Sequence, residues 1–344
     1  MTAEANALPI ELLRRTSRSF YLTLRVLPEA VRHQIGIAYL LARTADTIAD
    51  TELLPARRRL EALRALRERI VGRSDAPIAI SEFATRAGTE AERALLEQAE
   101  ASLALLGRLS PSDLKLVRWV LDIIITGQER DLTFFGPGGN AQPAQVKALR
   151  DDGELDDYTY RVAGCVGEFW TKLCRAHLFP EAQLDDEKLL ADGVRYGRGL
   201  QLVNVLRDLA ADLRRGRCYL PATRLADAGL DAASLLEPAN EQKLRPIYNS
   251  YLARAAALLD SGWAYTNALP RRQVRLRLAC SWPILIGLKT LGRLRTSPVL
   301  DPAYRVKVSR AEVYRTLVLT IVCYPFPGLW TELYRAAAAP VRTA

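Results

Sequence analysis

Two segments of the sequence each carry a pair of aspartates at a spacing suited to binding a cation. Asp46 and Asp50 form the first pair, and Asp208 and Asp212 form the second. In a helix, residues at positions i and i+4 lie on the same face, and two like charges there repel by roughly 0.2–0.5 kcal/mol. A divalent cation between the carboxylates would relieve that repulsion. Mg²⁺ suits the position, because it accepts one or two carboxylates and completes its shell with water and phosphate oxygens.

Further polar side chains share the helical face of each aspartate pair. Tyr39 and Arg43 precede the first pair, and Gln201 and Asn204 precede the second, at steps of three and four residues. Arg43 and Arg207 stand beside the acidic residues, where a guanidinium would hold phosphate oxygens directly. Two facing helices of this kind would clamp a diphosphate through bridging ions. We therefore predict a diphosphate site that both segments build.

The flanks of both polar stripes are apolar. Leu40 and Ile48 lie beside the first, and Leu202, Val205 and Leu206 lie beside the second. A single aspartate pair is more often a solvated face or an ion pair with a nearby arginine. Two pairs, both embedded in apolar helix and both accompanied by arginine, favour a binding site instead.

The elements that must position these residues are expected to be helices. Apolar residues recur at steps of three and four along the chain, and no convincing alternating strand pattern bounded by hairpin turns is present. Pro28 suits a first helical residue, and Ser110 with Pro111 suits another helix start. That helix is expected to end at a loop over residues 136–140. Further helices are expected at residues 157–178, 185–214, 241–268, 272–294 and 309–322.

These expectations give an all-α fold class. One helical domain spanning residues 1–344 is the economical interpretation, with residues 317–344 as a tail that would lie close to a membrane. The apolar run from Leu317 to Trp330 is too short to span a bilayer and is broken by Pro325 and Pro327. It would rest on a bilayer surface or pack on the core as a terminal helix, and both interpretations stay open.

The bulk composition narrows the partners and the compartment. The formal charge of +9 indicates affinity for anions, whether nucleic acid, a lipid headgroup or a phosphorylated metabolite. The five cysteines lack the CxxC spacing of a zinc or redox site, so we predict reduced thiols in a cytoplasmic protein. The first residues lack the layout of a secretory signal. We expect the protein in the cytoplasm, or at the inner face of the membrane.

Four blocks of the sequence resemble the squalene and phytoene synthase family. They occur in the family's order and are Thr16–Phe20, Tyr39–Asp50, Tyr158–Gly167 and Gln201–Pro221. The resemblance implies a prenyltransferase with the isoprenoid synthase fold, a single-domain bundle of helices around a central cavity. In one departure, Ala49 and Ala211 stand where eukaryotic members often carry a glutamate. That difference puts in doubt how many carboxylates touch each ion.

The resemblance also implies roles for individual residues. The magnesium ligands would be Asp46, Asp50, Asn204, Asp208 and Asp212. The substrate-binding residues would be Arg18, Ser19, Phe20, Tyr39, Gln201 and Tyr219. Arg43 and Arg207 would help Asp46 and Asp208 to ionise the diphosphate, and Tyr158 or the released diphosphate would remove a proton. As ordinary structure, the aromatic residues among these would be core fillers.

Three further segments bear on the product. Val166–Trp170, Cys280–Pro283 and Arg305–Arg310 look more like the squalene enzymes of the family than the phytoene enzymes. This favours the joining of two farnesyl diphosphates to presqualene diphosphate and its reduction by NADPH to squalene. Lys307 and Arg310 are the candidates for contacts with the NADPH phosphates, with a solvated basic face as the alternative for both. A dehydrosqualene or phytoene synthase, which releases an unreduced product, is the alternative function.

Two other classes of protein deserve comparison. A terpene cyclase also uses an aspartate cluster and magnesium, but the Tyr158–Gly167 block and the second acidic segment argue against it. A basic helical scaffold that binds a membrane or nucleic acid would explain the charge. It would leave the polar stripes within apolar helices unexplained, and we expect no nucleic-acid partner.

Overall fold

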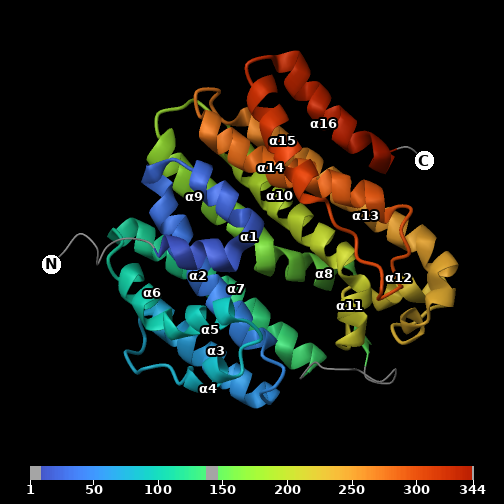
Figure 1. The fold of residues 1–344 in the computed structure, drawn as a ribbon, viewed down its shortest axis with the longest axis horizontal. Coiled ribbons are helices and arrows are strands. Elements are labelled where there is room, and N and C mark those ends of the chain that lie inside the picture. Colours follow the sequence, from blue (N-terminus) through green and yellow to red (C-terminus); the bar gives the residue numbers. More distant parts are fainter. Residues whose placement is uncertain (1–8, 137–145, 343–344) are drawn as a thin grey trace. The chain divides into compact units, whose positions relative to one another are not determined.

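The protein is built of helices joined by short loops (Figure 1). The computed structural model describes residues 9–136 and 146–342, apart from the side chains of Arg18 and Ser19. The chain divides into two compact units, of which the first comprises Met1–Pro137 with Phe169–Ala182 and the second comprises Gly138–Glu168 with Gln183–Ala344. The all-α class is confirmed. That the chain forms a single domain stays a prediction.

The first unit is organised around one long helix. Its elements are α1 (Ile10–Val26), α2 (Glu29–Asp50), α3 (Ala56–Val71), α4 (Ser81–Thr85), α5 (Glu90–Glu97), α6 (Ala99–Leu106), α7 (Pro111–Phe135) and most of α9 (Cys165–Leu178). Helix α2 packs against α1, α3, α5, α6 and α7. Its apolar side, with Leu40, Leu41 and Ile48 at 0% exposure, is completely buried. The opposite, polar side is therefore held in a fixed orientation.

Two predicted helix starts are close to those observed. Ser110 caps α7 by accepting a hydrogen bond from the Asp113 backbone N–H over 3.2 Å, and Pro111 is the first helical residue. Pro28 was expected to be the first helical residue, but α2 begins at Glu29, so Pro28 lies just before the helix. Most of the predicted loop at 136–140 lies outside the described residues.

The second unit contains the remaining elements. They are β1 (Lys147–Ala148), α8 (Asp152–Thr159), η3 (Tyr160–Gly164), the start of α9, α10 (Asp186–Arg207), α11 (Leu209–Arg214), β2 (Arg217–Cys218), α12 (Ala222–Ala226), η4 (Ser234–Leu236), η5 (Pro238–Asn240), α13 (Glu241–Ala268), α14 (Val274–Leu294), α15 (Arg310–Cys323) and α16 (Pro327–Arg342). Helix α10 packs along α13, and the two strands form one short parallel pair. This pair fixes the chain on either side of the segment that runs from α8 to α11.

Two predicted helices differ from the structure. The helix expected at 157–178 begins earlier, at Asp152, and passes through a π-helical turn, η3, before it continues as α9. The helix expected at 185–214 is split at Asp208, whose φ of −99° and ψ of 9° leave the helical range. Asp208 thereby ends α10 and begins α11. The helix predicted at 241–268 matches α13.

Glycines bring the segment η3–α9 unusually close to α10. A Cβ atom on Gly167 would lie 2.0 Å from the carbonyl oxygen of Gly193, and one on Gly197 would lie 2.1 Å from that of Ala163. No side chain larger than hydrogen fits at either position without movement of a backbone. The two segments are therefore locked together by direct backbone contact.

The cysteines and the hydropathy of the helices agree with two further expectations. All five cysteines are buried and none forms a disulfide. Within residues 9–136 and 146–342, no helix is long and apolar enough to cross a membrane.

Candidate active site

Helix α2 presents the first acidic segment on its polar side. Arg43 forms an ion pair with Asp46 one turn later and lies 3.3 Å from a carboxylate oxygen of Glu92 on α5. Asp46 is half-buried, whereas Asp50 is exposed at the end of the helix. Burial disfavours the charged form of Arg43, but the carboxylates of Asp46, Glu92 and Asp50 outweigh it and raise the pKa of the guanidinium. The first acidic segment thus consists of aspartates already matched to a cationic side chain.

Aromatic side chains continue this polar side towards α1. The rings of Phe20 and Tyr39 stack with centroids 4.7 Å apart, and the Tyr39 hydroxyl donates to the Thr16 carbonyl over 3.2 Å. Burial raises the pKa of Tyr39 to about 12, so the phenol stays protonated at neutral pH. Arg18 and Ser19 lie on α1 next to Phe20, and their side chains are outside the described part of the chain. Their predicted contacts stay predictions.

The second acidic segment lies across the junction of α10 and α11. The Arg207 guanidinium donates two hydrogen bonds to the Asp208 carboxylate, from Nε to Oδ1 over 3.0 Å and from Nη2 to Oδ2 over 2.5 Å. Burial opposes ionisation of Asp208, but the hydrogen bond and charge of Arg207, assisted by Arg305, outweigh it and lower the pKa of the carboxyl. Asp212 follows one turn later on α11 and is half-buried. This segment repeats the aspartate and arginine pairing seen on α2.

Arg305 joins the site although its role was not predicted from the sequence. Its Nη2 lies 3.3 Å from Oδ1 of Asp208, although the two residues are far apart in the sequence. The basic composition of residues 305–310 was the only signal for this contact. Lys307 and Arg310 are exposed neighbours of Arg305, and Arg310 begins α15. The segment that carries the predicted NADPH contacts is therefore anchored beside the second acidic segment.

A chain of hydrogen bonds connects the polar residues of α10 with α8. The Asn204 amide donates to Gln201 Oε1 over 3.3 Å, and Gln201 Nε2 donates to the Tyr158 hydroxyl over 3.1 Å. The Tyr158 ring stacks on buried Tyr219 at 4.3 Å. The structure thus brings together four residues that the sequence predicted for the site.

Ion pairs fix the position of α8 and hence of Tyr158. Asp156 accepts from Arg198 on α10 and from Arg254 on α13. Arg198 also points at the Thr159 hydroxyl, over 3.4 Å. Because these contacts join α8 to two other helices, Tyr158 is oriented by a rigid frame rather than by its own segment.

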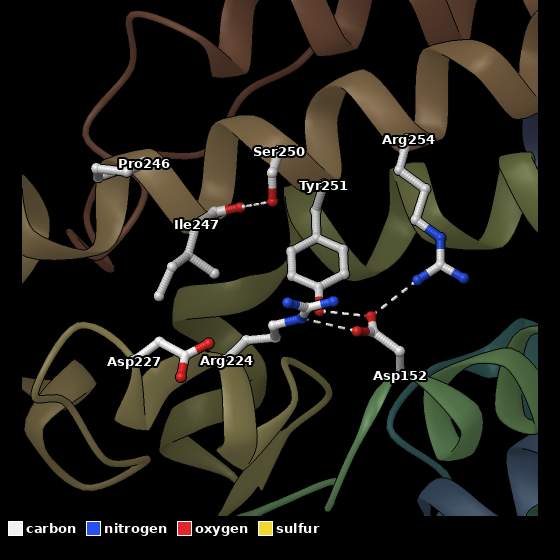
Figure 2. Close-up of a pocket in the computed structure, with 8 residues that line it drawn as sticks. All are labelled: Asp152, Arg224, Asp227, Pro246, Ile247, Ser250, Tyr251 and Arg254. Carbon is white, nitrogen blue, oxygen red and sulfur yellow. Dashed lines mark hydrogen bonds and ion pairs between the residues drawn. The ribbon is translucent and has the colours of Figure 1, made fainter.

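A pocket of about 470 Å³ in the second unit lies outside the predicted site (Figure 2). Asp152 is its central anion, and it accepts from the Tyr251 hydroxyl, Arg224 and Arg254 at 2.8, 2.8 and 2.9 Å. The hydrogen bonds of Tyr251 and Arg224 overcome the effect of burial and lower the pKa of Asp152. We interpret this cluster as a structural ion-pair network that holds α8, α12 and α13 together.

The side chains of the two acidic segments suit magnesium. In the part of the chain that the structure describes, no three His, Cys, Asp or Glu side chains gather into a group that could hold a metal ion. Each acidic segment instead offers two carboxylates, and Asn204 adds an amide oxygen. Mg²⁺ accepts one or two carboxylates and takes its other ligands from water and substrate phosphates. The residues fit such an ion, and that the two acidic segments face one another stays a prediction.

Comparison with known proteins places this arrangement in a family. The family model for squalene/phytoene synthase matches residues 13–312. The Botryococcus squalene synthase of Botryococcus braunii is 26% identical over 88% of this chain, and the bifunctional lycopene cyclase/phytoene synthase of Pyrenophora tritici-repentis is also 26% identical over 88%. The chain spans 60% and 47% of these two relatives. The presqualene diphosphate synthase of Rhodopseudomonas palustris is 28% identical over 75% of this chain and 77% of its own length.

A solved structure supports the fold. The complex of TcSQS with the ligand BPH1237 superposes with a TM-score of 0.73 over 98% of both chains, at 19% identity. The expected isoprenoid synthase fold is thereby confirmed. Because the family model covers most of the sequence, the chain belongs to the squalene/phytoene synthase family.

Proposed function

We propose that the protein is a squalene synthase that joins two molecules of farnesyl diphosphate head to head to presqualene diphosphate and reduces this with NADPH to squalene. The observation that carries the proposal is the repeated pairing of arginine with aspartate, Arg43 with Asp46 and Arg207 with Asp208. Each pair offers a carboxylate for a cation and a guanidinium for a phosphate oxygen. Those are the groups that ionisation of an allylic diphosphate requires.

The charged residues of the site would stabilise the leaving diphosphate. Bound magnesium would neutralise the charge that develops on the diphosphate oxygens. Arg43, Arg207 and Arg305 would donate hydrogen bonds to the same oxygens once substrate competes with the aspartates for them. The salt bridges of the free protein would then be exchanged for contacts with the substrate.

The aromatic residues would act on the prenyl chains. The faces of Phe20, Tyr39 and Tyr158 would favour a nearby allylic cation and exclude water from it. Tyr158 would remove the proton lost during condensation and pass its own hydroxyl proton to the released diphosphate, with its hydroxyl oriented by Gln201. Released diphosphate is the other candidate for that step.

The reduction would use the segment next to the second acidic site. Lys307 and Arg310 would contact the phosphates of NADPH, because Arg305 holds their segment against Asp208. A solvated basic face is the alternative for both residues. Substituting both by glutamine should therefore raise the KM for NADPH while consumption of farnesyl diphosphate is unchanged.

The decisive experiment supplies farnesyl diphosphate and magnesium to the purified protein, with and without NADPH, and identifies the products. Squalene formed only with NADPH, and presqualene diphosphate without it, would support the proposal. Dehydrosqualene in both samples would favour a synthase that does not reduce its product. Presqualene diphosphate in both would limit the activity to the condensation.

A phytoene synthase is the second candidate, because a relative of equal identity carries that name. Such an enzyme would release an unreduced product. Product identification with and without NADPH separates the two functions, since only a squalene synthase should need NADPH for its final product.

A further inference from the structure

Helix α15 buries the less apolar of its two sides. Its buried residues are Thr316, Thr320 and Cys323. Trp282 Nε1 donates to Thr320 over 2.9 Å, and Lys289 Nζ donates to Thr316 over 2.6 Å, so this side is held by hydrogen bonds. A helix that packs only to complete a core shows the opposite arrangement, with its apolar stripe inside.

The outer side of α15 is a continuous apolar stripe. Tyr314, Val318, Ile321 and Val322 follow one another at helical steps, and each is more than half exposed. The stripe continues over the turn into α16. We call the whole set the α15 apolar surface, and it consists of Tyr314, Val318, Ile321, Val322, Phe326 and Leu329. Half of the large apolar side chains that are exposed in the described residues lie on it, and such clustering marks an interaction surface.

Helix α16 provides a contrast within the same unit. Its apolar residues Trp330 and Tyr334 are buried, and both rings stack on Trp263 of α13 at 4.9 and 4.7 Å. Helix α16 therefore attaches the pair of helices α15 and α16 to the second unit. The apolar stripe on α15 takes no part in this packing and stays exposed.

Arginines surround the α15 apolar surface. Arg310 and Arg315 are exposed at the start of α15. Arg271 and Arg272 are exposed beside the turn, where Arg271 donates to the Pro325 carbonyl over 2.9 Å. No charged residue occurs from Thr316 to Thr331. Glu332 follows this run and pairs with Arg335 over 3.7 Å, so the surface has an apolar centre and a rim in which arginines outnumber carboxylates.

We propose that the α15 apolar surface docks onto an anionic lipid bilayer, with α15 lying in the plane of the interface. An interfacial helix buries an apolar face at the acyl boundary, while arginines at its edge bind anionic headgroups. A second copy of the chain is a poorer occupant, because symmetric pairing would bring two basic rims of a +9 chain together. The inference goes beyond the proposed function, since it concerns where the chain binds rather than what it catalyses.

The test is flotation of the full chain with vesicles of phosphatidylcholine alone and of phosphatidylcholine mixed with phosphatidylglycerol. The protein should float with the mixed vesicles, and much less with the neutral ones. The double variant Ile321→Glu with Phe326→Glu should lose flotation. Arg272→Glu with Arg315→Glu should weaken it by about fivefold or more for each arginine replaced. Ile10→Glu, at an exposed apolar residue of α1, should float as the parent does.

Light scattering and circular dichroism complete the experiment. All variants should keep the helical signal and the oligomeric state of the parent. Failure of the parent to float with mixed vesicles, or unchanged flotation of the Ile321 and Phe326 variant, would overturn the proposal. So would a parent dimer that this variant converts to a monomer without any vesicle binding, because the occupant would then be a second copy. None of these measurements depends on the catalytic activity of the protein.

Discussion

The guanidinium of Arg305 lies 3.3 Å from Oδ1 of Asp208, and Arg207 binds both oxygens of the same carboxylate. Two cations therefore converge on one anion at the junction of α10 and α11. Such a surplus of positive charge suits a place that receives a polyanion, because the ligand can replace the carboxylate as partner of both arginines.

Replacing Asp208 by asparagine should lower turnover by about 100-fold or more, because the cation would lose a carboxylate. Asp46→Asn should behave likewise. The matched control is Asp227→Asn, an exposed aspartate of the same unit, which should keep full activity. Rates are measured with farnesyl diphosphate, and circular dichroism verifies the fold. If the Asp46 and Asp208 variants kept the parental turnover, the aspartates would not bind a catalytic cation, and the basic helical scaffold would become the better hypothesis.

Removing the hydroxyl of Tyr158 should lower kcat by about 100-fold if this residue accepts the proton. Tyr158→Phe keeps the ring that stacks on Tyr219, so the KM for substrate should change little. Tyr160→Phe is the control, because the Tyr160 hydroxyl bonds Glu168 instead. Steady-state kinetics distinguish the cases. A Tyr158→Phe enzyme with the parental kcat would assign the proton to the released diphosphate.

A methyl group at Gly197 should destabilise the protein by about 1–3 kcal/mol or more. Its Cβ would lie 2.1 Å from the Ala163 carbonyl oxygen, where only backbone movement could make room. Gly328→Ala, at a helical glycine with nothing within 4 Å of the added atom, should be close to neutral. Denaturant unfolding measures both. Equal stability of the two variants would show that η3 and α10 are not in close contact.

Stability should depend on pH through Asp152. Its pKa is lowered in the folded state, so its contribution is present above the unfolded pKa of about 3.9 and is lost as the pH falls through the lower folded value. Asp152→Asn should cost roughly 1 kcal/mol at pH 7 and almost nothing well below pH 3.9. Urea unfolding at both pH values tests this. A cost that stays constant with pH would assign the loss to packing.

The sequence was informative where the determinants are local. The polar side of α2 follows from the spacing of Tyr39, Arg43 and Asp46 among mostly apolar neighbours. The start of α7 follows from the serine and proline that precede its first turn. In both cases the residues that decide the structure lie within a few positions of one another.

Other features depend on partners distant in sequence. The break at Asp208 is compatible with the helical spacing of Asn204 and Asp212, so periodicity alone gives no sign of it. Arg305 reaches Asp208 from 97 positions further along the chain. The inverted burial of α15 escaped prediction as well, because hydropathy assigns Thr316 and Thr320 to solvent.

The π-helical turn η3 changes the phase of the helix that contains it. Tyr158 and Gly167 are nine positions apart, and an uninterrupted α-helix would point them in roughly opposite directions. The extra residue of a π turn removes about 100° of that rotation, so that the tyrosine and the glycine can both meet α10. Regular α-helical winding over the same residues would rotate the phenol by about 100° relative to Gly167 and turn it away from Gln201. The π-helical winding of this family block, as much as its composition, thus sets the direction of one side chain.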